Sequence, residues 1–79
     1  RDEILQKVID VTASVLKVDP DQVKGESNFV FDLGAESVQS IELVSAFEEA
    51  FEIEMDPDAA LEVQTVNAAV EFIAGYLDG

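Results

Sequence analysis

Residues 32–51 read DLGAESVQSIELVSAFEEAF, and this stretch decides the fold. Its apolar residues recur at intervals of three and four, which is the spacing of an amphipathic helix. The pattern predicts a helix from residue 36 or 37 to residue 51. One side of this helix should face a core, and it carries Leu43, Val44, Phe47, Ala50 and Phe51. Because an apolar helix face must be covered, the rest of the chain has to supply packing partners.

The opposite side of this helix is acidic, and at 100° per residue it holds Glu42, Glu49 and Glu52. Val38 lies on the same side, with Ile41 and Glu48 at its edge. Exposed apolar groups ringed by charge indicate a partner-binding patch. Single exposed apolar side chains are also common on ordinary surfaces, so both interpretations stay open at this point.

Four carboxylates crowd the end of the predicted helix, namely Glu48, Glu49, Glu52 and Glu54. The helix dipole disfavours negative charge there, by about 0.3–1 kcal/mol per group at low salt. No cation lies nearby in the sequence. A small domain gains no stability from this arrangement, which favours partner recognition over an acidic face kept only for solubility.

The flanking segments also show helical patterns. Residues 2–17 carry a stripe made of Ile4, Leu5, Val8, Val11, Thr12, Val15 and Leu16. Residues 18–35 are predicted to be a long ordered loop, in which Asp19 before Pro20 caps a turn or short helix. Its apolar residues Phe29, Val30, Phe31 and Leu33 should pin the loop onto the core.

Two further helices are predicted after residue 55. Asp56 followed by Pro57 is a helix start signal, and it predicts a short helix over residues 57–61. Thr65 should cap a last helix that ends near Gly79. The apolar stripe of that helix is Val66, Ala69, Val70, Ile73 and Leu77. We therefore expect an all-α bundle of three longer helices and one short helix, forming a single domain over residues 1–79.

Composition narrows the function. The net charge is −14, from 18 acidic and 4 basic residues, and no Lys or Arg follows Lys24. Such an acidic chain should avoid nucleic acid and anionic membranes and should attract partners with basic patches. The chain has no histidine and no cysteine, so Ser-His-Asp catalysis, disulfides and thiolate metal sites are excluded. The lack of cysteine fits a reducing compartment. No signal-peptide pattern is present at the start of the sequence. Because the first residue is Arg1 and not methionine, the removal of a targeting segment stays an open possibility.

Ser37 stands at the start of the predicted helix, and two interpretations of it remain open from position alone. A serine at a helix start is usually a cap. A phosphate ester on its hydroxyl would instead meet exposed backbone N–H groups and the positive end of the helix dipole.

The motif around Ser37 resembles that of the acyl carrier protein family. The family pattern is D-L-G-x-D-S-L, followed by an acidic helix that contains E-L-V and a Glu-Glu pair. In this chain, residues 32–38 read DLGAESV. The acidic helix follows, with IELV at residues 41–44 and AFEE at residues 46–49. The match extends upstream to Val23 and Phe29 and downstream through residues 65–69. It spans essentially the whole chain.

This resemblance implies several properties. Ser37 would receive 4′-phosphopantetheine, whose thiol holds acyl groups as thioesters, and the chain would act as a carrier without catalysis of its own. The implied partners are a phosphopantetheinyl transferase and acyl-transferring, ketosynthase and reductase enzymes of fatty-acid or polyketide pathways. The implied docking residues are Glu36, Val38, Ile41, Glu42, Glu48 and Glu49. The bundle interior can shelter the acyl chain in this family, and we expect a cytoplasmic monomer.

The sequence departs from the family pattern at four positions. Glu36 replaces Asp, Val38 replaces Leu, Gln39 stands where an acid is common, and Ser45 stands where an apolar residue is common. These four differences affect which partner enzymes the chain would recognise. The possibility that it is a specialised carrier, and not the housekeeping one, therefore stays open. The competing interpretations are an acidic interaction protein without the group and a calcium- or magnesium-binding protein. No EF-hand loop and no G-x-S-x-G motif is present, so we expect no specific metal site and no hydrolase activity.

Overall fold

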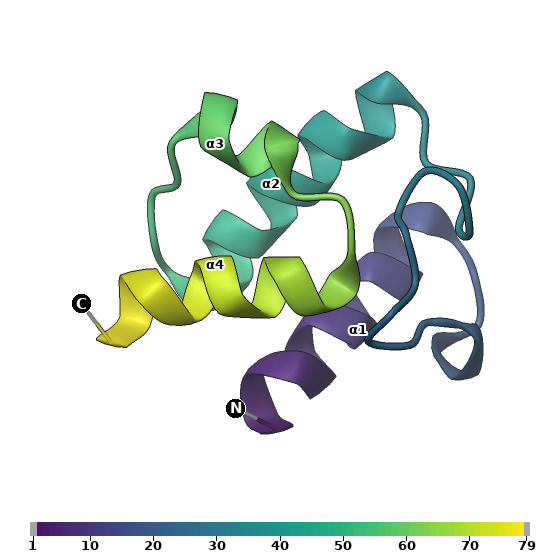
Figure 1. The fold of residues 1–79 in the computed structure, drawn as a ribbon, viewed down its shortest axis with the longest axis horizontal. Coiled ribbons are helices and arrows are strands. Elements are labelled where there is room, and N and C mark those ends of the chain that lie inside the picture. The colour runs from purple at the N-terminus through teal and green to yellow at the C-terminus, as the bar shows by residue number, and fades with distance from the viewer. Residues whose placement is uncertain (1, 79) are drawn as a thin grey trace.

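The computed structural model describes residues 2–78, except for the side chain of Asp78. Its elements are α1 (Asp2–Leu16), the 3₁₀ helix η1 (Pro20–Gln22), α2 (Ser37–Phe51), α3 (Pro57–Glu62) and α4 (Val66–Asp78). Strand-like pairing within residues 2–78 is limited to one isolated antiparallel bridge, between Asn28 and Thr65. The predicted all-α architecture is confirmed, with its three longer helices, its short helix and its long first loop (Figure 1). The predicted end near Gly79 lies outside the described residues.

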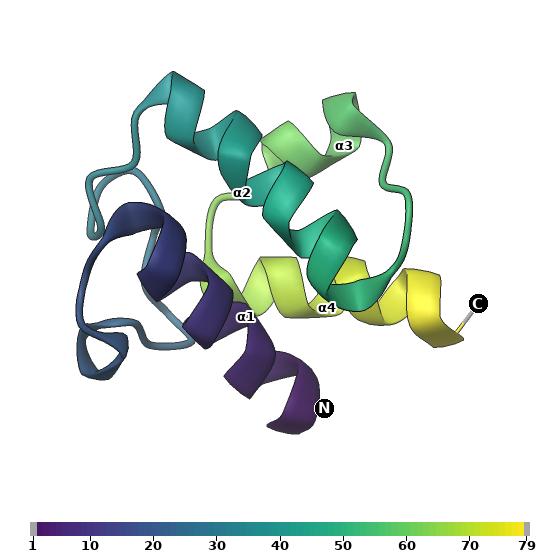
Figure 2. The same cartoon turned by 180° about the vertical axis from the view of Figure 1, so that it is seen from behind.

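The helix α1 packs its apolar stripe against both α2 and α4 (Figure 2). Val8 and Thr12 are completely buried, and Leu16 is nearly so. The helix ends one residue before the predicted Lys17, because Lys17 adopts a left-handed backbone with φ of 58°. The stripe read from the sequence is therefore the face that holds α1 in the bundle.

Thr12 is the one buried polar side chain in residues 2–78 whose polar atom, Oγ1, has no hydrogen-bond partner. A buried unpaired hydroxyl costs about 1–3 kcal/mol of desolvation. We therefore expect Thr12→Val, which keeps the shape and removes the hydroxyl, to stabilise the fold by about 1 kcal/mol. Urea unfolding followed by circular dichroism should show a higher midpoint at unchanged slope.

Thr65→Val is the matched control for that substitution. Thr65 Oγ1 accepts a hydrogen bond from the Ala68 N–H at 3.1 Å and caps α4, as the sequence predicts. Losing this cap should destabilise the fold by about 1 kcal/mol. A lower midpoint for both variants would mean that the Thr12 hydroxyl has a favourable role.

The loop between α1 and α2 is held by its own polar groups. The Asp19 carboxylate accepts from the Asp21 N–H at 3.0 Å and caps η1 as predicted. Asn28 Oδ1 accepts from the N–H groups of both Val30 and Phe31, at 2.9 and 3.0 Å. The loop is also tied to the segment before α4, since the Phe29 N–H donates to Gln64 O at 2.9 Å. The loop is therefore ordered, as expected.

Two of the four apolar residues predicted to pin this loop do not do so. Phe29 is buried and Leu33 is half-buried, but Val30 is 51% exposed and Phe31 is 86% exposed. Asn28 Oδ1 holds residues 30 and 31 in a turn, and this local hydrogen bonding leaves both side chains largely exposed. The prediction for Val30 and Phe31 was wrong.

The last two helices begin where the cap signals place them. The Asp56 carboxylate accepts from the Asp58 N–H at 3.0 Å, and Pro57 is the first residue of α3. The stripe of α4 is buried through Val66, Ala69, Val70 and Ile73. Leu77, predicted to continue that stripe, is 46% exposed instead. It lies in the last turn of α4, where the helix projects past the bundle (Figure 1), so no facing element covers it.

Candidate functional site

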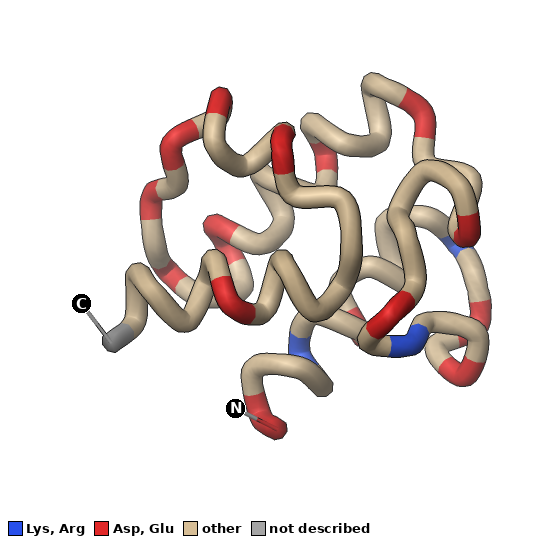
Figure 3. The backbone as a smooth tube through the Cα atoms, in the orientation of Figure 1, with Lys and Arg blue, Asp and Glu red and all other residues tan. Residues whose placement is uncertain are grey.

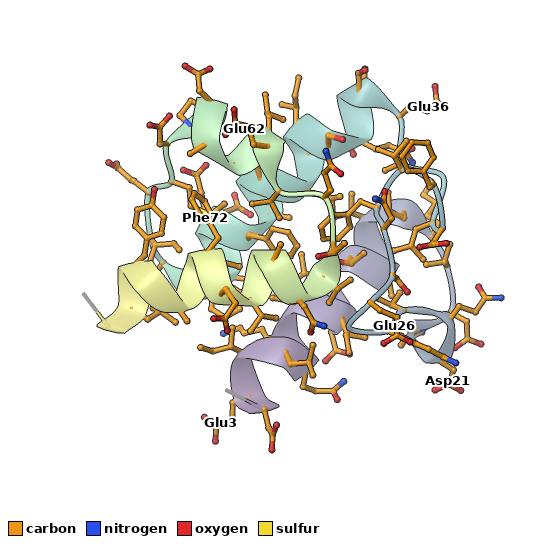
Figure 4. All side chains as sticks on the ribbon, in the orientation of Figure 1. Glu3, Asp21, Glu26, Glu36, Glu62 and Phe72 are labelled. Atoms are coloured by element: carbon orange, nitrogen blue, oxygen red, sulfur yellow. The ribbon has the colours of Figure 1, made fainter. Side chains whose placement is uncertain are left out.

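The start of α2 depends on three residues that lie just before the helix or in its first turn. Gly34 adopts φ of 73°, a left-handed backbone that turns the chain into the helix. Glu36 occupies the N-cap position with extended backbone angles. Its N–H donates to Gln39 Oε1 at 2.9 Å. This bond satisfies the backbone N–H of the N-cap residue, and Figure 4 places the Glu36 side chain outward at this end of α2.

Ser37 is the first residue of α2, and its side chain is exposed. Its Oγ forms no hydrogen bond within the described part of the chain, in contrast to the capping hydroxyl of Thr65. The interpretation of Ser37 as a cap is therefore wrong, because Glu36 takes that position. The hydroxyl is available for covalent chemistry, beside N–H groups at the helix start that have no helical acceptor.

The outward face of α2 carries the exposed apolar pair expected from the sequence. Val38 is 67% exposed and Ile41 is 61% exposed. Glu42 and Glu49 are exposed on the same helix. Ser45, one turn from each of Ile41 and Glu49, is exposed as well. These residues form a continuous strip, which we call the α2 face: Val38, Ile41, Glu42, Ser45 and Glu49.

Glu48 differs from its acidic neighbours. It is half-buried, and its Oε2 accepts a hydrogen bond from the backbone N–H of Met55 at 2.8 Å. Its backbone oxygen also accepts from the Ile53 N–H at 3.1 Å. Glu48 therefore holds the segment between α2 and α3. No sequence signal indicates this role, since the bond spans seven residues and depends on the left-handed turn at Glu52, where φ is 56°.

A cation does lie close to the end of α2, although the sequence suggests none. The Nζ atom of Lys7 on α1 lies 5.2 Å from the centre of the Phe51 ring. Such cation–π contacts contribute about 0.5–1 kcal/mol at exposed sites. Lys7 is distant in sequence, so only the packing of α1 on α2 brings it there. Figure 3 shows that acidic residues otherwise dominate the tube around α2 and α3.

An apolar cavity of about 260 Å³ opens between α2, α3, α4 and the first loop. Its walls include Leu43, Phe47, Met55, Phe72 and Ile73. Figure 4 places Phe72 between α4 and α3. The volume exceeds the roughly 150 Å³ of an engineered apolar cavity that holds benzene. An aliphatic group of several carbons can therefore enter it.

Three polar residues are among those that line the cavity. Ser40, one turn after Ser37, lines the cavity together with Asn28 and Gln64. Leu61, half-exposed on α3, lines it from the other side. Leu61 and Gln64 were not predicted from the sequence. The one sequence signal for Leu61 is its apolar side chain at the end of the predicted short helix.

Within residues 2–78, no group of three or more Asp, Glu, His or Cys side chains is placed to hold a metal ion. The chemistry of the site rests on the Ser37 hydroxyl, the helix start, the α2 face and the cavity.

Comparison with known proteins identifies the family. Residues 6–73 match the family model described as the phosphopantetheine attachment site. Over 73 residues the chain is 49% identical to an acyl carrier protein of Prochlorococcus marinus (strain MIT 9515), covering 92% of this chain and 91% of the relative. The chain belongs to the acyl carrier protein family. It is a non-catalytic carrier, and its prosthetic group is 4′-phosphopantetheine.

The start of α2 in this acyl carrier protein is suited to hold a phosphopantetheine group. The Ser37 hydroxyl is exposed and unpaired among the described residues. The neighbouring helix N-terminus favours an anionic phosphate through its free N–H groups and its dipole. Within residues 2–78, no helix has the length and apolar character needed to cross a membrane.

Proposed function

We propose that Ser37 is the attachment residue and that the chain carries acyl groups for fatty-acid or polyketide enzymes. The observation that carries this proposal is the exposed, unpaired Ser37 hydroxyl at the start of α2, within the segment that matches the family model. In the attachment reaction, Ser37 Oγ would form an ester bond to the pantetheine phosphorus of coenzyme A as the phosphoanhydride bond of coenzyme A breaks. Adenosine 3′,5′-bisphosphate would leave, and the Ser37 hydroxyl proton would pass to solvent.

The start of α2 would favour the resulting phosphodiester. The N–H groups of the first turn have no helical acceptors, so they could donate to an anionic phosphate on Ser37. The nearby acidic side chains repel an anionic phosphate, as does the net charge of −14. The positive end of the α2 dipole offsets part of this repulsion. When bound, the arm supplies the thiol on which acyl groups are held, and the residues of this chain supply presentation and shelter.

The cavity is the proposed shelter for the acyl chain. Ser40, one turn from Ser37, is among its lining residues, and most of the other lining residues are apolar. Burial of each methylene group favours the sheltered state by about 0.8 kcal/mol. This gain in free energy favours aliphatic acyl groups over charged ones. It therefore fits the acyl chains of fatty acids and of reduced polyketides.

The α2 face, together with Glu36 and Glu48, is the proposed docking surface. Its exposed apolar pair and surrounding carboxylates complement partner surfaces that combine an apolar patch with Lys or Arg. The proposed partners are a phosphopantetheinyl transferase and acyl-transferring, ketosynthase and reductase enzymes. We further propose that the chain forms a single domain and acts as a cytoplasmic monomer, which agrees with its lack of cysteine.

Intact mass spectrometry tests the proposal directly. After incubation with coenzyme A and a broad-specificity phosphopantetheinyl transferase, the chain should gain the mass of one phosphopantetheinyl group. No gain would favour an acidic interaction protein that keeps the fold without the attachment chemistry.

A further inference from the structure

A second hollow of the surface lies between α1 and α2. These helices pack side by side (Figure 2), and the groove between them has a volume of about 420 Å³. Its apolar lining residues are all half-buried, namely Val11 and Val15 on α1 and Ala46 and Ala50 on α2. The two alanines lie one turn apart, and their small side chains leave the space open. The groove shares no lining residue with the cavity, so the two are separate features.

The polar residues that line this groove include an acid from each helix. Asp10 and Ser14 on α1 and Glu49 on α2 are its exposed lining residues, whereas the apolar ones are half-buried. Asp10 Oδ1 accepts a hydrogen bond from Gln6 Nε2 at 3.1 Å. Within residues 2–78, neither carboxylate is paired with a lysine side chain. The groove therefore combines an apolar floor with two uncompensated negative charges.

This combination fits a long basic side chain. Lys and Arg bury an apolar stem against protein surface and keep the charged end exposed. In the groove, the stem would lie on the half-buried residues and the charged end beside the carboxylates. A second copy of this chain is a poorer occupant, because two chains that each carry a net charge of −14 repel one another. The charges favour a basic side chain of another protein.

The groove is continuous with the proposed docking surface. Glu49 lines the groove and also belongs to the α2 face, and Ala46 directly follows Ser45 of that face. A specific interface of standard size involves about 20–30 residues on each partner, far more than the five residues of the α2 face. An enzyme docked on the α2 face therefore has to extend over neighbouring surface, and the groove is part of that surface.

We propose that the groove between α1 and α2 receives a Lys or Arg side chain of a ketosynthase docked on the α2 face. The charged end of that side chain lies between Asp10 and Glu49. The proposal rests on the proposed function, because it adds a contact on α1 to the docking surface proposed there. Asp10 thereby helps to select partners, although it lies outside the acidic helix.

Removal of the α1 charge gives the first test, with the chain bearing its phosphopantetheine arm and surface plasmon resonance as the readout. Asp10→Asn keeps the size of the side chain and should weaken ketosynthase binding about fivefold, the upper end for a single exposed charge pair. The loss should lie mainly in the dissociation rate, because this pair forms only in the docked complex. Asp21→Asn removes the same charge from the exposed first loop and should leave dissociation unchanged. Equal effects of the two variants would overturn the proposal.

Filling the groove gives the second test. Ala46→Leu changes no charge, occupies part of the groove and should weaken binding at least about fivefold. Ala68→Leu adds the same side chain at an exposed position of α4 that lines neither hollow, and should leave binding unchanged. In the Ala46→Leu chain, Asp10→Asn should add little, because the basic side chain no longer reaches the carboxylate. Parent affinity in Ala46→Leu, or fully additive losses, would overturn the proposal.

Three measurements keep the outcomes apart. A urea midpoint near that of the parent shows that Ala46→Leu is folded, and Asp10→Asn at its exposed position tests the groove without this substitution. Self-association of the parent in analytical ultracentrifugation that disappears in Ala46→Leu would assign the groove to a second copy and overturn the proposal. Failure of the carrier function is a separate result, because it is seen as the absence of phosphopantetheine in the mass spectrum of the parent.

Discussion

Ser37→Ala should abolish attachment of phosphopantetheine completely while the helical circular dichroism spectrum stays that of the parent. The loss is complete because the substitution removes the only atom that can form the ester at this position. The fold should survive because Glu36, not Ser37, is the N-cap and the Ser37 hydroxyl has no partner among the described residues. Alanine is also the better helix former, so the change in unfolding free energy should stay within about 0.5 kcal/mol.

Two serines on the same helix provide matched controls. Ser40 is half-buried and lines the cavity, and Ser45 is exposed on the α2 face. Ser40→Ala and Ser45→Ala should both accept one phosphopantetheinyl group at full occupancy in the intact mass spectrum. Modification that persists in Ser37→Ala, or disappears in Ser40→Ala, would assign the arm to another hydroxyl.

The second large effect is expected from reversing the charges of the α2 face. The double variant Glu42→Lys and Glu49→Lys should slow association with a ketosynthase by at least about tenfold at low salt, since steering by complementary charge raises on-rates roughly 10- to 1,000-fold. Stopped-flow fluorescence gives the rate. The difference should shrink at about 0.5 M salt because screening shortens the reach of surface charges. The fold should not weaken, since a positive charge in place of Glu49 would lie near the negative end of the helix dipole.

Asp21→Lys with Glu26→Lys is the control for total charge. Each double variant changes the net charge from −14 to −10, because each reversal adds two units. Both control residues are exposed on the first loop, which Figure 4 shows away from Glu36 at the start of α2. Equal slowing in the two double variants would mean that total charge, and not the α2 face, governs docking.

The helices could be predicted from the sequence because local signals set their ends. Asp19, Asp56 and Thr65 each accept the backbone hydrogen bond that the capping rules assign to them. The buried faces followed from helical spacing, as Val8 and Ile73 illustrate. The exposed pair Val38 and Ile41 was found in the same way, by its position opposite the core stripe.

The features that sequence reasoning missed depend on contacts between distant segments. Lys7 reaches Phe51 only because α1 packs on α2. Glu48 was read as a docking acid, and its bond to Met55 becomes visible only once the turn after α2 has its three-dimensional path. Phe31 was assigned to the core because hydrophobicity was weighed without the turn that Asn28 organises. The cavity requires the relative placement of three helices and a loop, which periodicity does not provide.

Peptide mapping by tandem mass spectrometry, after transfer of the arm from coenzyme A, locates the modified residue in the chain. We predict a single phosphopantetheinyl group on the fragment containing Ser37, with the site-defining fragment ions placing it on Ser37 and leaving Ser40 and Ser45 unmodified. A group on either of those serines, or an unmodified chain, would show that Ser37 is not the attachment residue.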